Sequence, residues 1–484
     1  MNKIGRGSSK INQIMEKAPK RYHKIDFITL TNQKFEEYIP ESIPSIIKED
    51  IGYYFQYLKN NRSKISLTLW EKATGCTNSS NSWKTKNYRP IFSFLYYDRI
   101  TDGLFLPLLL KKIEITANRP GEISIAEFNR LCRLSIVGFK SKLDAIDLKI
   151  LQALSNDATL ITQEITEQIN HAYATVYNHL QRLKAKMGLR ITTKVNWLKL
   201  GVYRVFLISK NEKIFEKFDD FKSFLDGQSI FSWGEAYYLR YYFLREEIKN
   251  KLLEQIKLLS PMESKELMYY EVISNPIFGY DFESFDISEQ RWDFDFATSY
   301  LELSANREHP TFINLQGLTF ERTTIDKKEL TDLELHTIEG LVGNYSLTQK
   351  EIANLLGIHA PNLSIIRTKL LNENVIIPQM MVNTFLPLNL VLLCNTNKEG
   401  ILEKLALLLQ KLPFYNVSSV TSNDDSVKYH LLCFMGVDDI LYSSLVTFLM
   451  QLLKENEITD FRLGLTIDTY FGMSKVTDVL KSDL

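Results

Sequence analysis

Basic and polar side chains gather in residues 171–199 of this 484-residue chain, which hold six Lys or Arg and no Asp or Glu. Apolar residues recur there at helical spacing, which turns the other side chains toward the outer face of a helix. The apolar residues are Val176, Leu180, Leu183 and Met187. The outer face carries Thr175, Asn178, His179 and Arg182. Because Asn and Arg form bidentate pairs with adenine and guanine edges, each worth roughly 1–3 kcal/mol, we predict base contacts from these four residues.

Four cations lie in or just after the same helix: Lys184, Lys186, Arg190 and Lys194. Cations placed beside a helix that reads a groove bind phosphates, and the affinity that they supply falls as salt rises. We therefore predict that they hold the backbone of double-stranded DNA. The alternative is a solvated basic face on a helix-turn-helix that binds protein.

Three helices and a strand must position this face. In LDAIDLKILQAL, Asp144 can cap the first helix and Asp147 stands at its N3 position, close to a capping box. A second helix fits Thr162–Ile169 with its first residue as N-cap, and Asn170 tolerates the left-handed turn that follows. The helix with the basic face comes next, and then a short β pattern at 191–195. This order predicts a winged helix-turn-helix.

Residues 330–376 repeat the pattern of residues 143–189 without a gap, at a constant offset of 187. Gly357 stands where the first copy has Asn170, so both turns hold a residue that tolerates a left-handed conformation. The match predicts an internal duplication. The candidate DNA contacts of the second copy are Asn362, Ser364, Arg367 and Lys369. Because Glu373 is expected to face the two cations, the first copy should grip DNA better.

The order βαββαβ follows each copy and is typical of a ferredoxin-like sandwich. In the first half the elements fit 202–209, 212–225, 230–233, 237–243, 246–259 and 267–273. In the second half they fit 388–395, 398–412, 417–421, 427–434, 438–454 and 459–465. The predicted fold class is therefore α+β, with two tandem units of winged helix-turn-helix plus ferredoxin-like domain behind an N-terminal α/β segment of unknown fold.

These patterns resemble the Lrp/AsnC family of feast/famine transcriptional regulators. LDAIDLKIL follows the family's first-helix pattern, and the recognition helix fits with His179 in place of the usual Arg. The second copy ends in LLNENVI, with Asn374 where Gly is usual. The resemblance covers about 143–275 and 330–467, and implies a DNA-binding regulator that pairs through its sheet domains. Two units in one chain could pair internally as a pseudo-dimer or could self-associate. The family's effector pocket is not evident, with Gly227 and Gly234 as the candidates in the first copy.

The remaining segments divide the chain further. The predicted domains are 1–24, 25–142, 143–200, 201–275, 276–329, 330–386, 387–470 and 471–484. The first is a basic, flexible terminus, for which a DNA-binding arm and an organelle-targeting peptide are alternatives. Within the second, residues 124–140 fit either a plain helical pair or a degenerate helix-turn-helix. The segment 276–329 is an acidic, aromatic connector.

The composition is that of an ordinary soluble protein, with 45% hydrophobic residues and a formal net charge of zero. Its four cysteines are too scattered for a metal motif or a disulfide framework, and no apolar run is long enough to span a bilayer. We expect a cytoplasmic protein that does not bind a membrane.

Three functions are in competition. The leading one is a DNA-binding transcriptional regulator with a possible small-molecule effector. A protein-interaction scaffold is the second. The third is a tetrapyrrole-binding decarboxylase of the same fold, for which Arg240, Lys428 and His430 are the polar candidates in the sheets. No nucleophile motif or phosphate loop is present, and His171 and His179 are too far apart for a metal pair. We expect no enzymatic activity, no cofactor and no metal.

Overall fold

The computed structural model describes residues 97, 101, 104–117, 131–132, 134–136, 142–305, 328–343, 349–386, 388–422, 427–471 and 476–481. The chain divides into two compact units, Met1–Ser141 and Lys142–Leu484. In the first unit, helix α8 (Phe105–Ala117) has a fully buried apolar face. The predictions for residues 1–24 lie outside the described residues, as do most of those for 124–140. Among the described helices, none has both the length and the apolarity that crossing a membrane requires.

The second unit begins with the predicted helix-turn-helix. It consists of α10 (Ala145–Asn156), α11 (Thr162–Ile169), α12 (Tyr173–Met187) and β1 (Arg190–Val195). Asp144 and Asp147 form the capping box of α10. Asn170 has the left-handed conformation expected of it, at φ 53° and ψ 56°. The cap of α11 differs from the prediction, because Ile161 is its N-cap and the Ile161 N–H donates to the Glu164 side chain at 2.8 Å.

A four-stranded sheet with helices on one face follows. Its elements are β2 (Val202–Ser209), η3 (Glu212–Phe224), β3 (Leu225–Trp233), β4 (Glu235–Arg245), α13 (Glu246–Lys257), α14 (Pro261–Glu266) and β5 (Leu267–Val272), after a short turn η2 (Leu198–Leu200). The segment predicted as an α-helix at 212–225 is a 3₁₀ helix with a kink at Phe218. The strand predicted to begin at Ile230 begins five residues earlier and is longer.

The connector is short-stranded and lies against both halves. It comprises β6 (Ile277–Gly279), β7 (Phe285–Asp286), β8 (Arg291–Trp292) and α15 (Phe296–Ala305). Its Tyr280 backbone exchanges hydrogen bonds with the Ser155 hydroxyl on α10. The Asp281 N–H donates to the Leu412 carbonyl of the second half at 3.1 Å. The connector therefore ties the first helix-turn-helix to the second sheet.

The second half has the same order of elements. Three helices and a strand come first: α16 (Asp332–Gly343), α17 (Gln349–Leu356), α18 (Ala360–Asn372) and β9 (Ile376–Met381). The sheet segment comprises β10 (Leu388–Thr396), α19 (Glu399–Leu409), β11 (Phe414–Ser422), β12 (Tyr429–Val437), α20 (Asp439–Lys454) and β13 (Asp460–Phe471). Helix α21 (Val476–Lys481) then packs on α16. Gly357 is left-handed at φ 66°, as Asn170 is in the first half.

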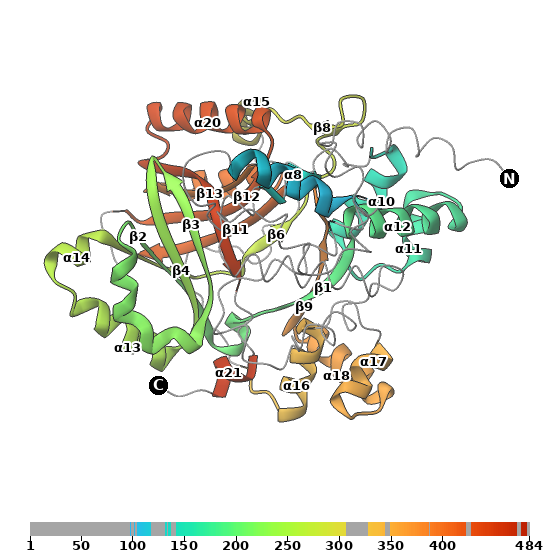
Figure 1. Ribbon diagram of the computed structural model, residues 1–484, viewed down its shortest axis with the longest axis horizontal. Coiled ribbons are helices and arrows are strands. Elements are labelled where there is room, and N and C mark those ends of the chain that lie inside the picture. The colour runs from blue at the N-terminus through green and yellow to red at the C-terminus, as the bar shows by residue number, and fades with distance from the viewer. Residues whose placement is uncertain are drawn as a thin grey trace. The chain divides into compact units, whose positions relative to one another are not determined.

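The two sheets join edge to edge into one closed ring (Figure 1). The first sheet has the order β3-β4-β2-β5 and the second has the order β13-β10-β12-β11. Strand β13 pairs with β3 and β11 pairs with β5, both antiparallel. Because side chains alternate along a strand, each strand sends one set of residues inward. Phe206, Leu239, Val391 and Leu432 belong to an inner cluster made only of strand residues from both halves.

The β-strands of the two helix-turn-helix segments pair with each other. Strand β1 lies antiparallel to β9, from Arg190 opposite Met381 to Val195 opposite Ile376 (Figure 1). Asn196 continues the pairing, since its backbone N–H donates to Val375 and its side chain to the Asn374 carbonyl at 3.0 Å. The sequence did not reveal this pairing, which connects the two helix-turn-helix segments directly.

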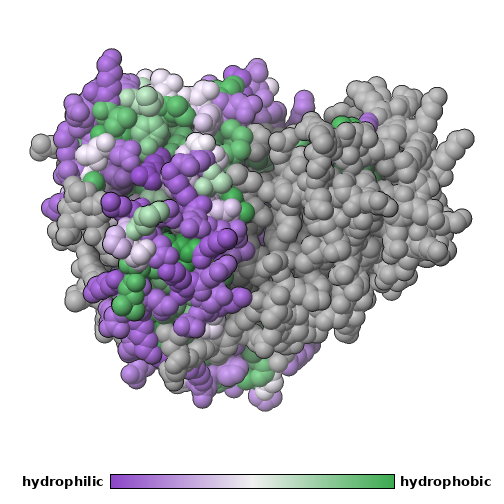
Figure 2. All heavy atoms as spheres, turned by 60° about the vertical axis from the view of Figure 1, so that its left-hand side comes forward, coloured by the Kyte–Doolittle hydropathy of each residue, from purple (hydrophilic) through white to green (hydrophobic). Residues whose placement is uncertain are grey.

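The surface of the described residues is mixed. Hydrophilic residues predominate on the face shown in Figure 2, and hydrophobic residues form smaller, separate patches among them. The two most exposed large apolar side chains are Leu258 and Met262, at 85% and 76%. Leu258 caps the end of α13 and Met262 lies in the first turn of α14, away from the helix-turn-helix segments in the chain.

Candidate nucleic-acid interface

Helix α12 has the two faces that its spacing predicts. Val176, Leu180, Leu183 and Met187 are buried. Asn178, Arg182, Lys184 and Arg190 are exposed, while Thr175, His179 and Lys186 are half-buried. Tyr173 and Tyr177 of α12 are 55% and 47% exposed, and their rings stack on each other.

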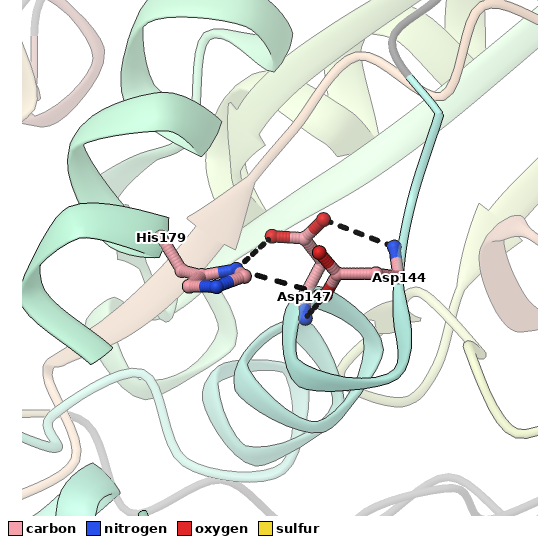
Figure 3. Close-up of side chains that lie close together, drawn as sticks. All are labelled: Asp144, Asp147 and His179. Atoms are coloured by element: carbon pink, nitrogen blue, oxygen red, sulfur yellow. Dashed lines mark hydrogen bonds and ion pairs between the residues drawn. The ribbon is translucent and has the colours of Figure 1, made fainter. Parts of the chain in front are cut away.

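Two residues of the outer face, His179 and Arg182, turn back toward α10, and Figure 3 shows His179 beside the two carboxylates. The His179 ring nitrogen Nδ1 lies 2.9 Å from Oδ1 of Asp147, and the Arg182 guanidinium bonds to both Asp144 and Asp147. The Asp144 contact is 2.9 Å long. We call these four residues the helix clamp, because they fasten α12 to the start of α10.

Opposite charges in the helix clamp shift the pKa values of their partners. Burial raises the pKa of Asp144, but hydrogen bonds from the Asp147 N–H and from Arg182 outweigh it, so the pKa of Asp144 is lowered. Burial lowers the pKa of Arg182, yet its contacts with the two carboxylates raise the pKa overall. The charged forms therefore stabilise each other, and a DNA contact by His179 or Arg182 would compete with this pairing. That contact stays a prediction.

The same side chains are the one candidate metal cluster among the described residues. Ligand atoms of Asp144, Asp147 and His179 all lie within 4.8 Å of one another, an arrangement that the sequence reasoning missed. The guanidinium of Arg182 already bonds to both carboxylates. A bound cation would have to displace it, so the geometry fits an ion-paired clamp better than a metal centre.

The second half has a smaller clamp at the corresponding positions. Lys369 bonds to Glu334 at 2.7 Å, and these residues lie 187 positions after Arg182 and Asp147. Glu373 pairs with Lys328 at 3.1 Å, and its charge also raises the pKa of Lys369, one of the two cations of α18 that it was predicted to face.

The outer face of α18 differs from that of α12. Asn362, Ser364 and Lys369 are exposed, and Arg367 is half-buried. Ile365 is 68% exposed at the position that Asn178 has in the first half. Of the four candidate contacts on α18, Lys369 is engaged by Glu334, so this face offers DNA less positive charge than α12 does.

Lys194 does not lie among the cations of α12. Its ammonium group donates to the Pro276 carbonyl at 3.0 Å. Burial, with a smaller contribution from the charge of Arg204, lowers the pKa of Lys194 to about 8. Lys194, which was predicted to contact phosphate, therefore lies at the junction between β1 and the sheet.

The polar side chains weighed for a tetrapyrrole are occupied by neighbours. Arg240 donates to the Phe215 carbonyl at 3.3 Å, and His430 lies 2.8 Å from the Asn395 side chain. The Lys428 ammonium lies over the Tyr429 ring at 4.7 Å. Near the glycines considered for an effector, the Trp233 indole donates to the Val391 carbonyl. This contact is sheet packing between the halves.

The comparisons with known proteins support the first helix-turn-helix. A protein-family model described as winged helix-turn-helix DNA-binding matches residues 143–186, which include α10, α11 and α12. No curated protein matches the chain.

Solved structures offer only distant likenesses. The siroheme decarboxylase NirDL has a TM-score of 0.42 at 12% identity, covering 69% of this chain and 96% of NirDL. Its complex with an iron-uroporphyrin III analogue gives 0.41 at 10%, covering 69% and 95%. PH0061 gives 0.18 at 18% identity, covering 24% and 85%. None of these likenesses is close enough to assign a function to this chain.

Proposed function

We propose that this protein is a DNA-binding transcriptional regulator that reads DNA through α12. The observation that carries the proposal is the outward polar and basic face of α12, within the segment that matches a winged helix-turn-helix DNA-binding family. A helix of this kind enters the major groove with its exposed side chains toward the base edges. We assign no catalytic role to the chain.

The proposed contacts divide by position. Thr175 and Asn178 would face bases, and Asn178 is suited to adenine. Lys184, Lys186 and Arg190, toward the end of α12 and the start of β1, would face phosphates. His179 and Arg182 would act as positioning residues, because their contacts with α10 set the angle of the helix that carries Asn178.

We further propose that the two halves descend from one duplicated unit and form a pseudo-dimer within the chain. The antiparallel pairing of β1 with β9, and the two matching junctions of the sheet ring, support this view. In such a pair α12 is the stronger reader and α18 the weaker one. An operator for this protein would then have two unequal half-sites.

A protein-binding scaffold is the second candidate. It is favoured by the stacked, exposed rings of Tyr173 and Tyr177 and by Ile365, since aromatic and apolar side chains are enriched where proteins meet. The affinity of such a surface for its partner would depend little on salt. The affinity of a phosphate-binding face would fall steeply as the salt concentration rises.

The test is the binding of random duplex DNA at about 50 and about 200 mM salt, followed by fluorescence anisotropy. The variant Lys184→Ala/Arg190→Ala removes two exposed cations from the proposed face. The control Lys213→Ala/Lys222→Ala removes two exposed cations from η3, so the net charge changes equally.

We expect the first variant to reduce the slope of log affinity against log salt by about 2, because each lost phosphate contact reduces it by about 1. The control should keep the slope of the wild type. Binding that is insensitive to salt, or equal losses in both variants, would favour the scaffold.

A further inference from the structure

Two tyrosines at the beginning of α12 present their rings to solvent. Tyr173 is the first residue of the helix and Tyr177 follows one turn later, so their side chains share one flank of α12. The rings stack with their centroids 6.3 Å apart and an interplanar angle of 13°. They are 55% and 47% exposed. The ring pair therefore offers aromatic surface to whatever this helix binds.

The residues around the ring pair leave it accessible. Ala172 and Ala174 stand on either side of Tyr173 in the chain, are exposed, and have only methyl side chains. Lys184 follows Tyr177 by seven residues, which is about two helical turns, so it lies on the same flank, and it is exposed. We call Tyr173, Tyr177 and Lys184 the aromatic flank, because it has rings at one end and a positive charge at the other.

The second half lacks the ring pair. The positions 187 residues later, at the start of α18, hold Ala360 and Ser364. Helix α18 nevertheless forms and buries Leu363 and Leu370. The fold that the two halves share therefore does not explain the two tyrosines, and their exposure indicates a role in binding.

The charge around the rings indicates the kind of partner. Residues 171–199 hold six Lys or Arg and no Asp or Glu. A partner that covers the aromatic flank must therefore offer negative charge and apolar surface together. The major groove of DNA offers both, because phosphates border it and the C5-methyl group of thymine projects into it. The N-terminal residues of a recognition helix, where both tyrosines lie, are those that reach the base edges.

We propose that Tyr173 and Tyr177 recognise the C5-methyl group of pyrimidines in the major groove. The inference rests on the proposed function, the reading of DNA by α12, and adds the chemical group that the helix recognises. Apolar and aromatic side chains contact this methyl group on thymine. 5-Methylcytosine has the same methyl group on the same ring carbon, so it would fit the rings equally well. Asn178 follows Tyr177 and is suited to adenine, so α12 would carry contacts for both bases of an A·T pair.

The test uses one mixed-sequence duplex in three forms: unmodified, with uracil in place of every thymine, and with 5-methylcytosine in place of every cytosine. Uracil lacks only the methyl group of thymine and keeps its hydrogen-bonding groups. Binding to the full chain is followed by fluorescence anisotropy. We expect uracil to weaken binding about fourfold and 5-methylcytosine to strengthen it by a similar factor, which is the effect of burying one such carbon.

The variant Tyr173→Ser/Tyr177→Ser removes both rings, and α12 should remain folded because Ser and Tyr have similar helix propensities. This variant should bind the three forms with equal affinity. Tyr173→Phe/Tyr177→Phe retains the rings and should retain the preference of the wild type. Tyr442→Ser is the matched control, since Tyr442 is a tyrosine of α20 with 38% exposure, and it should leave each affinity unchanged.

The outcomes distinguish this inference from the function on which it rests. A response to one modified base alone, lost in the Ser variant, would identify that base as the source of the methyl group. Salt-sensitive binding that is equal for the three forms in the wild type would overturn the inference and leave the proposed function in place. A methyl preference that persists in the Ser variant would also overturn it and would favour a protein partner for the rings. Absence of binding to all three forms would overturn both.

Discussion

Asp147→Asn tests the helix clamp most directly, because the Asp147 carboxylate is completely buried and has three partners. The Asp144 N–H donates to it at 3.1 Å, His179 lies at 2.9 Å, and Arg182 bonds to its second oxygen. Hydrogen bonds to a charged group contribute about 1.5–3 kcal/mol each, and breaking a buried ion pair costs about 3–5 kcal/mol. Arg182 is 43% exposed and keeps its contact with Asp144, so the loss should be about 2–4 kcal/mol.

Hydrogen exchange of the backbone amides measures this loss locally in the full chain. Amides of α12 should exchange on the order of 100-fold faster in Asp147→Asn, since 1.4 kcal/mol is about a factor of ten. Glu334→Gln makes the equivalent change in the second half, where a single cation, 50% exposed, is the ionic partner. Its effect should be smaller and confined to α16–α18. Unchanged exchange in α12 of Asp147→Asn would refute the idea that the clamp holds this helix.

Three further predictions concern neighbouring residues. Arg182→Lys should keep DNA affinity within about threefold of the wild type, whereas loss of a direct guanine contact would cost roughly 1–3 kcal/mol in a binding titration. The pKa of Lys194 in the folded chain, about 8, is below its ordinary 10.5, so the unfolded chain binds more protons between these values and stability should rise with pH there. In Lys194→Met, denaturant titrations across this window should lose that rise. Asn196→Ala removes the side-chain bond to the Asn374 carbonyl and should lower the unfolding free energy by about 1–3 kcal/mol; an unchanged denaturation midpoint would contradict this.

The sequence predicted the parts of the fold that local chemistry determines. The left-handed turn at Asn170 and the capping box of Asp144 and Asp147 were both readable from residue type and spacing. The N-cap of α11 was predicted at the wrong residue, because two neighbouring residues can start this helix. Thr162 can cap a helix, but the Ile161 N–H donates to the Glu164 side chain and the helix begins one residue earlier than a Thr162 cap would require.

Long-range pairing was not readable in this way. Nothing in the alternation of residues 190–195 distinguishes a strand that faces solvent from one that pairs with β9, far along the chain. The same limit applies to Lys194, whose position in a basic run suggested a phosphate contact. Its place beside Pro276 depends on where β5 ends. The clamp partners of Arg182 were likewise hidden, although a fixed offset between acid and base in both halves could have indicated them.

Comparison of positions 187 residues apart distinguishes the residues that both halves share for their fold from the residues that only one half has. An acid on the first helix and a base on the third recur in both halves, as the pairs Asp147–Arg182 and Glu334–Lys369. Lys184, Lys186 and Arg190, the predicted phosphate contacts that stay beside α12, do not recur, for the positions 187 residues later hold Leu371, Glu373 and Ile377. A feature kept in both halves is explained by the fold that they share, whereas basic residues present only in the first half are not explained by that shared fold. The positive charge around α12 therefore points to a role in binding, and it gives α12 and α18 unequal parts in that role.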